Sequence, residues 1–217
     1  MAKLQGLGAL LPGRVWRALL EAGTDRRFAA GEVLVRQGDP GTHVLLLTAG
    51  IVKVTRFEPN GEELLLALRG PGEAIGEIAV LDGTERSANV VAAGSCTTRV
   101  VGGARFRRLV DELGVQDVLM RHILGRFREG EDVRAELAEL PAGARLARVM
   151  CRLADAVGGD RPVLALSQEE LARATGLSRS AVAAELAPLR RNGVVITGRG
   201  RLTVRDIAAL RALAEKG

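Results

Sequence analysis

Two charged side chains of opposite sign stand close together in the segment Gly76–Ala88, and each lies next to apolar residues. Glu77 precedes one short apolar run, and nine positions later Arg86 and Ser87 precede another. A glutamate accepts hydrogen bonds from sugar hydroxyls, whereas an arginine fork and a serine hydroxyl donate to phosphate oxygens. These residue types suit the sugar-phosphate end of a nucleotide. The alternative is a Glu77–Arg86 salt bridge that stabilises a turn.

A short helix over Gly76–Leu81 would place these side chains on the wall of one pocket. Its N-terminus would present free N–H groups to an anion, and Gly76 would let the backbone approach the ligand closely. Short apolar runs separated by turn residues surround this segment from Arg27 to Val101. The runs are Val33–Val35, Val44–Leu47, Ile51–Val54, Leu64–Leu68, Val90–Ala92 and Thr98–Val101, and Asn60-Gly61 marks a hairpin. We therefore expect a closed or rolled antiparallel β domain, preceded by a helix over Leu10–Glu21.

Helical spacing replaces this pattern from about Phe106. The apolar residues at three- and four-residue steps are Leu109, Leu113, Leu119, Ile123, Phe127, Val133 and Leu137. A helix of this length cannot bury its whole apolar face locally, so it predicts a dimer seam, although Gly125 and Gly130 weaken it. Pro141 is expected to end it. The predicted domains are a sensor over 1–104, a dimerisation helix over 105–140 and a third domain over 141–217.

The last of these domains carries the basic excess of the chain. Residues 141–217 hold 13 Lys and Arg against 7 Asp and Glu, a balance of +6, whereas residues 1–140 hold 18 against 19. Such a segregated charge favours nucleic acid as the partner. The alternative is a merely solvated basic surface.

The same domain has the element order of a winged helix-turn-helix. Ser167 and Glu170 form a capping box at the start of a helix over Gln168–Ala174. The turn Thr175-Gly176-Leu177 follows, and Ser178 caps a second helix that begins at Arg179. Two strand-like runs, Val194–Thr197 and Arg201–Val204, then enclose a glycine turn and form a wing. A helical hairpin that does not bind DNA is the alternative reading.

If the second helix enters the major groove, its first turn faces the bases. Arg179 can bond guanine, Ser180 is ambiguous, and Ala183 offers a contact only to a thymine methyl group. Pro188 should kink or end the helix, at a cost of ~3 kcal/mol if uncompensated. The candidate DNA-binding residues are Gln168, Ser178, Arg179, Ser180, Ala183, Arg199 and Arg201.

Several classes of protein and site are not expected. No uncharged run reaches the ~18 residues of a membrane helix, and the N-terminus lacks the pattern of a signal peptide, so we expect a cytoplasmic protein. Cys96, Cys151, His43 and His122 lack the spacing of metal ligands and are expected to be structural. No metal, haem or iron–sulfur cluster is expected. Without a nucleophile beside a base, the chain is not expected to be an enzyme.

The sequence resembles the Crp–Fnr family, the cyclic-AMP receptor proteins and their relatives, over nearly its whole length. The matching residues are Gly31, Gly38-Asp39, Gly50, G-E-I-A-V-L at Gly76–Leu81, R-S-A at Arg86–Ala88 and L-A-x-x-T-G-L-S-R at Leu171–Arg179. The resemblance implies an α+β protein with a β-roll sensor, a long dimer helix and a winged helix-turn-helix. It also implies a cyclic-nucleotide site formed by Gly76, Glu77, Ile78, Arg86, Ser87 and Ala88.

In this comparison Glu77 would bind the ribose 2′-OH, and Arg86 and Ser87 the cyclic phosphate. The base would meet Gly130 and Glu131, where the cyclic-AMP receptors carry hydroxyl residues. The base is therefore left open, with cyclic AMP favoured over cyclic GMP. The recognition helix reads S-R-S-A-V-A-A rather than S-R-E-T-V, so the family's usual operator is not assumed.

The resulting hypothesis is a homodimeric transcriptional regulator that binds a palindromic site in double-stranded DNA under the control of a cyclic nucleotide. RNA polymerase is a further candidate partner, through the loop after Val157. The alternatives are a family member that responds to another ligand or to none, and a cyclic-nucleotide-binding regulatory subunit of an enzyme.

Overall fold

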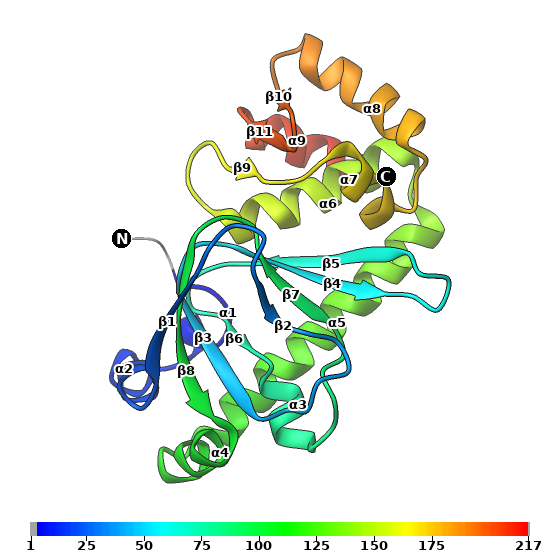
Figure 1. Ribbon diagram of the computed structural model, residues 1–217. Helices are drawn as coiled ribbons and strands as arrows, with labels where there is room; N and C mark the ends of the chain where they lie inside the picture. The colour runs from blue at the N-terminus through cyan, green and yellow to red at the C-terminus, as the bar shows by residue number, and fades with distance from the viewer. Residues whose placement is uncertain (1–3, 217) are drawn as a thin grey trace. The chain divides into compact units, whose positions relative to one another are not determined.

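The computed structural model describes residues 4–216, which form two compact units. One unit contains the chain up to Arg128 except Glu58–Ala67. The other contains Glu58–Ala67 and the chain beyond Arg128. Figure 1 labels the helices and strands. Each unit is described by itself.

The first unit is built on antiparallel strands, together with β5, whose residues up to Ala67 are counted with the other unit. They are β1 (Thr24–Phe28), β2 (Val33–Val35), β3 (His43–Ala49), β4 (Val52–Phe57), β5 (Glu63–Arg69), β6 (Ala74–Ile75), β7 (Asn89–Ala92) and β8 (Cys96–Gly102). One sheet has the order β1-β8-β3-β6 and the other β2-β7-β4-β5. This arrangement confirms the predicted antiparallel β domain and all six predicted strand runs, with shifts of up to three residues at their ends.

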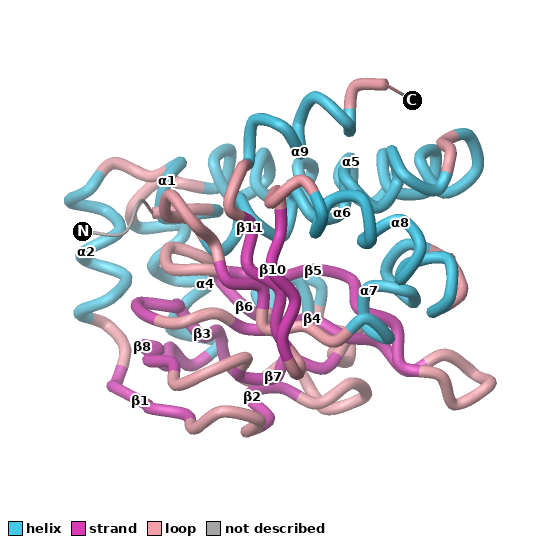
Figure 2. The backbone as a smooth tube through the Cα atoms, turned by 90° about the horizontal axis from the view of Figure 1, so that it is seen from above, coloured by secondary structure: helices cyan, strands magenta, loops and turns pink. Residues whose placement is uncertain are grey.

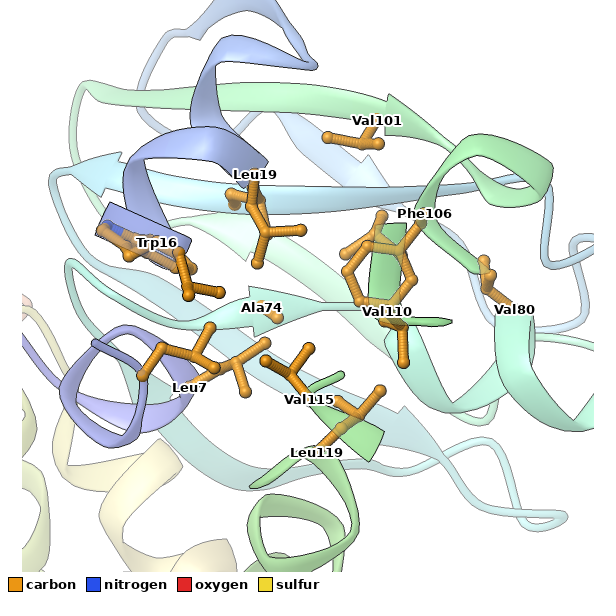
Figure 3. Packing of buried hydrophobic residues seen from close by; sticks show 14 residues of the cluster. Leu7, Trp16, Leu19, Ala74, Val80, Val101, Phe106, Val110, Val115 and Leu119 are labelled. Atoms are coloured by element: carbon orange, nitrogen blue, oxygen red, sulfur yellow. The ribbon is translucent and has the colours of Figure 1, made fainter. Parts of the chain in front are cut away.

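Helices cover one side of the first sheet. They are α1 (Gly6–Leu10), α2 (Gly13–Glu21), α3 (Glu77–Asp82) and α4 (Gly103–Glu112), followed by the long α5 (Gln116–Glu139). Figure 3 shows Trp16 and Leu19 of α2, Phe106 and Val110 of α4, and Leu119 of α5 packed together with residues of the strands. A second apolar cluster lies between the two sheets and includes Phe28, Leu45, Leu47, Val52 and Val90. Burial of these side chains holds the strands and helices around α3.

The helical pattern after Phe106 is interrupted. Sequence spacing predicted one helix with a gap in its stripe, but α4 ends at Glu112 and α5 begins at Gln116. Gly114 has a φ of 62° between them, a left-handed conformation that only glycine adopts readily. Val115 is buried at the break and joins the core with Leu119. The N-terminal helix differs too, because Leu11 and Pro12 divide the predicted Leu10–Glu21 into α1 and α2.

One contact fixes the far end of α3. Arg107 of α4 donates from NH1 to the carbonyl oxygen of Val80, 2.6 Å away. Carbonyl groups in the last turn of a helix lack partners within the helix, so a side-chain donor there stabilises its end. Helix α3 is therefore fastened to α4 at the end opposite Gly76.

The second unit contains α6 (Ala142–Val157), β9 (Val163–Leu164), α7 (Gln168–Thr175), α8 (Arg179–Arg191), β10 (Val195–Gly198), β11 (Arg201–Val204) and α9 (Ile207–Ala214). The sheet order is β10-β11-β9. Figure 2 labels the paired strands β10 and β11. Buried residues of α6, such as Leu146 and Met150, form its core with Leu171, Val182 and Leu186. Helix α6 contacts α7, α8 and α9. Pro141 is the N-cap of α6 and lies just beyond α5, as predicted.

Both capping predictions are confirmed in this unit. Ser167 and Glu170 form a capping box, and Ser178 accepts a hydrogen bond from the backbone of Ala181. Pro188 was expected to kink or end its helix, and it does not end it, because α8 continues to Arg191. The proline lies in the last turn, and the residue whose carbonyl it would have bonded, Ala184, is exposed, so water can satisfy that group.

Candidate functional site

Residues of α3 and of the loop before β7 face one cavity of ≈ 80 Å³ in the first unit. The residues that line it are Val35, Val54, Ile75, Gly76, Glu77, Ile78, Ala79, Arg86, Ser87, Ala88, Val90 and Arg126. All six sensor residues chosen from the sequence are among them. The structure therefore brings the two ends of the Gly76–Ala88 segment together at one site.

Gly76 is the residue that allows this approach. It is the N-cap of α3, with a φ of 80°. A Cβ atom at this position would lie 2.2 Å from NH1 of Arg86, well inside van der Waals contact. Both the backbone conformation and the close guanidinium therefore require glycine here.

Arg86 is held by backbone carbonyl groups. Its NH1 donates to the oxygen of Gly76 and its NH2 to the oxygen of His43, each at 2.5 Å. The side chain is 4% exposed. Burial lowers the pKa of Arg86, but an arginine remains charged in proteins. Since a guanidinium has five N–H donors, the two carbonyl bonds leave donors for an anion in the cavity.

Glu77 has its ion pair with a different arginine. Its Oε1 lies 3.1 Å from NH1 of Arg126 and 3.6 Å from Nε2 of His122, both on α5. Burial by itself would raise the pKa of Glu77, but Arg126 and His122 outweigh that effect and hold its pKa below the usual value. The carboxyl is therefore ionised at neutral pH.

The second oxygen of Glu77 is an unused acceptor. The residue is 0% exposed, and among residues 4–216 neither of its carboxylate oxygens has a hydrogen-bond partner, although Oε1 has the ion-pair contact with Arg126. Buried carboxylate oxygens are normally hydrogen-bonded, and an unpartnered one calls for a specific explanation. A ligand hydroxyl would supply the missing donor.

A second carboxylate lies beside this pair. NH2 of Arg126 donates to Oε2 of Glu73 at 2.7 Å and to the carbonyl oxygen of Ala74 at 2.9 Å. Nε2 of His122 lies 4.0 Å from the same Glu73 oxygen. Two residues one turn apart on α5 therefore contact two buried carboxylates at the cavity wall.

Sequence reasoning missed Arg126, His122 and Glu73. It chose Gly130 and Glu131 on the same helix, but these are not among the residues that line the cavity. Glu131 instead pairs with Arg134, and the space next to Gly130 is open. Arg126 lies one turn before Gly130 on the same helix face, and this was the available signal.

The candidate DNA-binding residues lie in the second unit on α7, α8 and the β10–β11 hairpin. Ser178, Arg179 and Ser180 are exposed at the start of α8, and Ala183 is half-buried. The hydroxyl groups of Ser178 and Ser180 are 2.9 Å apart and bond each other. Gln168 is the first residue of α7. Arg179 is thus the long hydrogen-bond donor of this first turn.

The wing has the predicted form. β10 and β11 pair antiparallel, with Gly198 opposite Arg201. Arg199 and Gly200 form the turn, and Gly200 has a φ of 65°. Both arginines are exposed at the tip, where they can meet phosphates.

Two family profiles match the sequence in these two regions. The cyclic nucleotide-binding domain matches residues 25–112, and the Crp-like helix-turn-helix domain matches residues 144–213. The first match contains the cavity segment, and the second contains α7, α8 and the wing. The fold and the two profile matches together define a DNA-binding transcriptional regulator with a cyclic nucleotide-binding domain.

Known proteins resemble the chain over most of its length. It is 32% identical over 190 residues to the Cyclic AMP receptor protein of Thermus thermophilus, covering 87% of each chain. It is also 32% identical to the Transcriptional regulator LdrP of that organism, covering 85% of this chain and 94% of the relative. A solved CRP/FNR-family regulator of T. thermophilus superposes with a TM-score of 0.72 at 26% identity, over 89% of this chain and 99% of that one. The chain belongs to the Crp–Fnr family of transcriptional regulators.

The described residues offer no candidate for a metal site or for a membrane-spanning helix. Within the described residues, no group of three or more His, Cys, Asp or Glu side chains is placed to hold a metal ion. None of the helices in residues 4–216 has the length and apolar character needed to span a membrane.

Proposed function

We propose that the cavity binds a cyclic nucleotide and that this ligand controls DNA binding by the second unit. The observation that carries the proposal is the fully buried Oε2 of Glu77, which lacks a donor beside a cavity also lined by Arg86 and Ser87. A ribose 2′-OH supplies that donor, and a cyclic phosphate accepts from the remaining N–H groups of Arg86.

The cavity must enlarge before a nucleotide enters. Its ≈ 80 Å³ is well below the ~300 Å³ at the lower end of small-molecule pockets. Arg86 bonds two carbonyl oxygens and Glu77 pairs with Arg126 of α5, so entry of a nucleotide would have to rearrange these contacts. Because ligand entry would alter the contacts of Arg126, it would act directly on α5.

Cyclic AMP is the favoured ligand because one of the two relatives at 32% identity is the Cyclic AMP receptor protein of Thermus thermophilus. The base is not set by this likeness, since Gly130 and Glu131 offer no hydroxyl group. The rival is a family member that senses another ligand or none. Thermal unfolding with cyclic AMP and with cyclic GMP is the test, followed by calorimetry. A ligand of the folded state raises the unfolding temperature. If neither nucleotide binds, the sensor proposal is wrong.

DNA readout is assigned to the start of α8 and to the wing. Arg179 would contact base edges while Arg199 and Arg201 contact phosphates. A dimer would place two copies of α8 in successive major grooves of a palindromic operator, about one helical turn apart. Ligand and DNA coupling is reciprocal, so operator DNA tightens nucleotide binding by the same factor. A regulatory subunit of an enzyme is disfavoured because the helix-turn-helix match covers residues 144–213.

The homodimer is proposed from the exposed face of α5. Met120, Leu124 and Phe127 are 56%, 42% and 65% exposed, and they follow one another at four and three residues. This spacing places them on one side of the helix. A second copy of the same helix has the matching apolar face, which makes an isologous dimer the natural partner.

Replacing Phe127 by Glu should therefore convert the dimer into a monomer at micromolar concentration, because a buried unpaired charge is costly in an apolar seam. Light scattering after size exclusion measures the mass. The control is Phe57→Glu, since Phe57 is 51% exposed on β4 and the substitution is the same. A Phe127 variant that stays dimeric would place the interface elsewhere.

A further inference from the structure

Arg126 and His122 of α5 contact two carboxylates, those of Glu73 and Glu77. The proposed nucleotide needs only the carboxylate of Glu77. Glu77 lines the cavity, whereas Glu73 does not. Glu73 nevertheless has a confined position. Its side chain is 8% exposed, and Arg126 contacts its Oε2 at 2.7 Å. The desolvation of a buried carboxylate is costly, so a charged or hydrogen-bonding partner must compensate for it.

Other elements also hold Glu73 in place. Its Oε1 lies 4.0 Å from Nε of Arg69. A Cβ atom at Gly6 of α1 would lie 2.1 Å from its Oε2, so α1 approaches the carboxylate as only glycine allows. Its position is therefore determined from several sides, and it fixes where NH2 of Arg126 lies.

Glu73 also determines how Arg126 meets Glu77. An arginine can bond both oxygens of one carboxylate in parallel. Here NH2 donates to Glu73 and to the oxygen of Ala74, while NH1 forms the ion pair with Oε1 of Glu77. Oε2 of Glu77 has no hydrogen-bond partner in the described part of the chain.

We propose that Glu73 is a positioning residue of the ligand site: by holding one arm of Arg126, it keeps Oε2 of Glu77 available to a hydroxyl group of the ligand. Without the charge of Glu73, Arg126 would bond both oxygens of Glu77 and compete with the ribose. Glu73 would thus determine how strongly the site distinguishes a ribose from a 2′-deoxyribose. This inference rests on the proposed nucleotide function.

The experiment compares the affinities of cyclic AMP and cyclic GMP with those of their 2′-deoxy analogues, by calorimetry on the full chain. In the unaltered protein, loss of a hydrogen bond to a buried carboxylate should weaken binding about 10- to 100-fold. In Glu73→Gln the ratio between the affinity of each nucleotide and that of its 2′-deoxy analogue should fall below about 3-fold. A purely structural role would weaken both members of a pair equally and leave the ratio unchanged.

Glu136→Gln is the matched control. Glu136 is also a buried glutamate, it bonds Arg152 at 2.7 Å in the second unit, and it does not line the cavity. Its ratio should equal that of the unaltered protein. Should Glu73→Gln fail to fold, Glu73→Asp keeps the charge but shortens the reach to Arg126, and it should give an intermediate ratio.

The outcomes separate the two proposals. A ratio that is high in the unaltered protein and equally high in Glu73→Gln overturns the role of Glu73 and leaves the nucleotide function intact. Binding without any discrimination in the unaltered protein overturns the role of Oε2 and, with it, that of Glu73. If neither nucleotide binds the unaltered protein, the proposed function itself fails together with this inference.

Discussion

Arg86→Ala should abolish nucleotide binding, with a loss of affinity on the order of 100-fold or more. Two hydrogen bonds from a charged donor to a cyclic phosphate contribute about 3–6 kcal/mol together, and every 1.4 kcal/mol is a factor of ten. Arg126 also lines the cavity, but it pairs with Glu73 and Glu77, whereas Arg86 lies close to Gly76 beside the backbone. Calorimetry with cyclic AMP and cyclic GMP measures the loss.

The same substitution also affects stability, so a matched variant is needed. Removing Arg86 leaves the carbonyl groups of Gly76 and His43 without their side-chain donors, at about 1–3 kcal/mol each. Arg107→Ala is the control, because Arg107 also bonds a carbonyl of α3 but does not line the cavity. It should lower the unfolding temperature and change nucleotide affinity only a few-fold. Equal losses in the two variants would contradict a phosphate role for Arg86.

Arg179→Ala should remove sequence preference in DNA binding. The first turn of α8 offers one long donor, and a bidentate contact to guanine contributes about 1–3 kcal/mol of discrimination. Affinity for an operator obtained by selection from random DNA should therefore fall about 10- to 100-fold per half-site, towards that of scrambled DNA. Mobility-shift titrations with both DNA molecules measure this ratio.

Arg199→Ala gives the contrasting behaviour. At the tip of the wing a phosphate contact is expected, so both DNA molecules should bind more weakly by a similar factor. The slope of log affinity against log salt should decrease by about one unit. If Arg179→Ala behaves in the same way, then Arg179 contacts phosphate and the sequence is read by other groups.

Helices, strands and turns that depend on residues close together in the sequence were predicted well. The capping box at Ser167 and the cap at Ser178 are decided by residues three positions apart, so the helix starts of the second unit could be read directly. The wing and the predicted strands followed from alternating apolar runs and turn residues. β1 was missed because only Phe28 of its five residues is buried. Backbone pairing with β8 holds this charged strand in place.

The candidate ligand site could be predicted only where its residues lie close in sequence. Glu77, Arg86 and Ser87 belong to one short segment, and the structure places them at one cavity. The contacts of Glu73 and Glu77 with Arg126 join residues about fifty positions apart. Such pairs leave no periodic pattern, and a glutamate beside an apolar run is equally compatible with solvent exposure. The break at Gly114 falls in the gap of the apolar stripe between Leu113 and Leu119, which the prediction treated as an irregularity within one helix.

The hydrogen bond from Arg107 to Val80 has a consequence for how relatives of this protein can diverge. Three arginines from three different segments contact α3 and its N-cap: Arg86 bonds the carbonyl of Gly76, Arg107 bonds that of Val80, and Arg126 pairs with Glu77. Lysine cannot replace the planar fork of Arg86 or Arg126 without losing a contact. New ligand preferences should therefore arise by change in the apolar wall, at Val35, Val54 and Val90, where substitutions disturb no charged partner. Helix α3 and its arginine contacts would stay the same while the apolar residues of the cavity wall change.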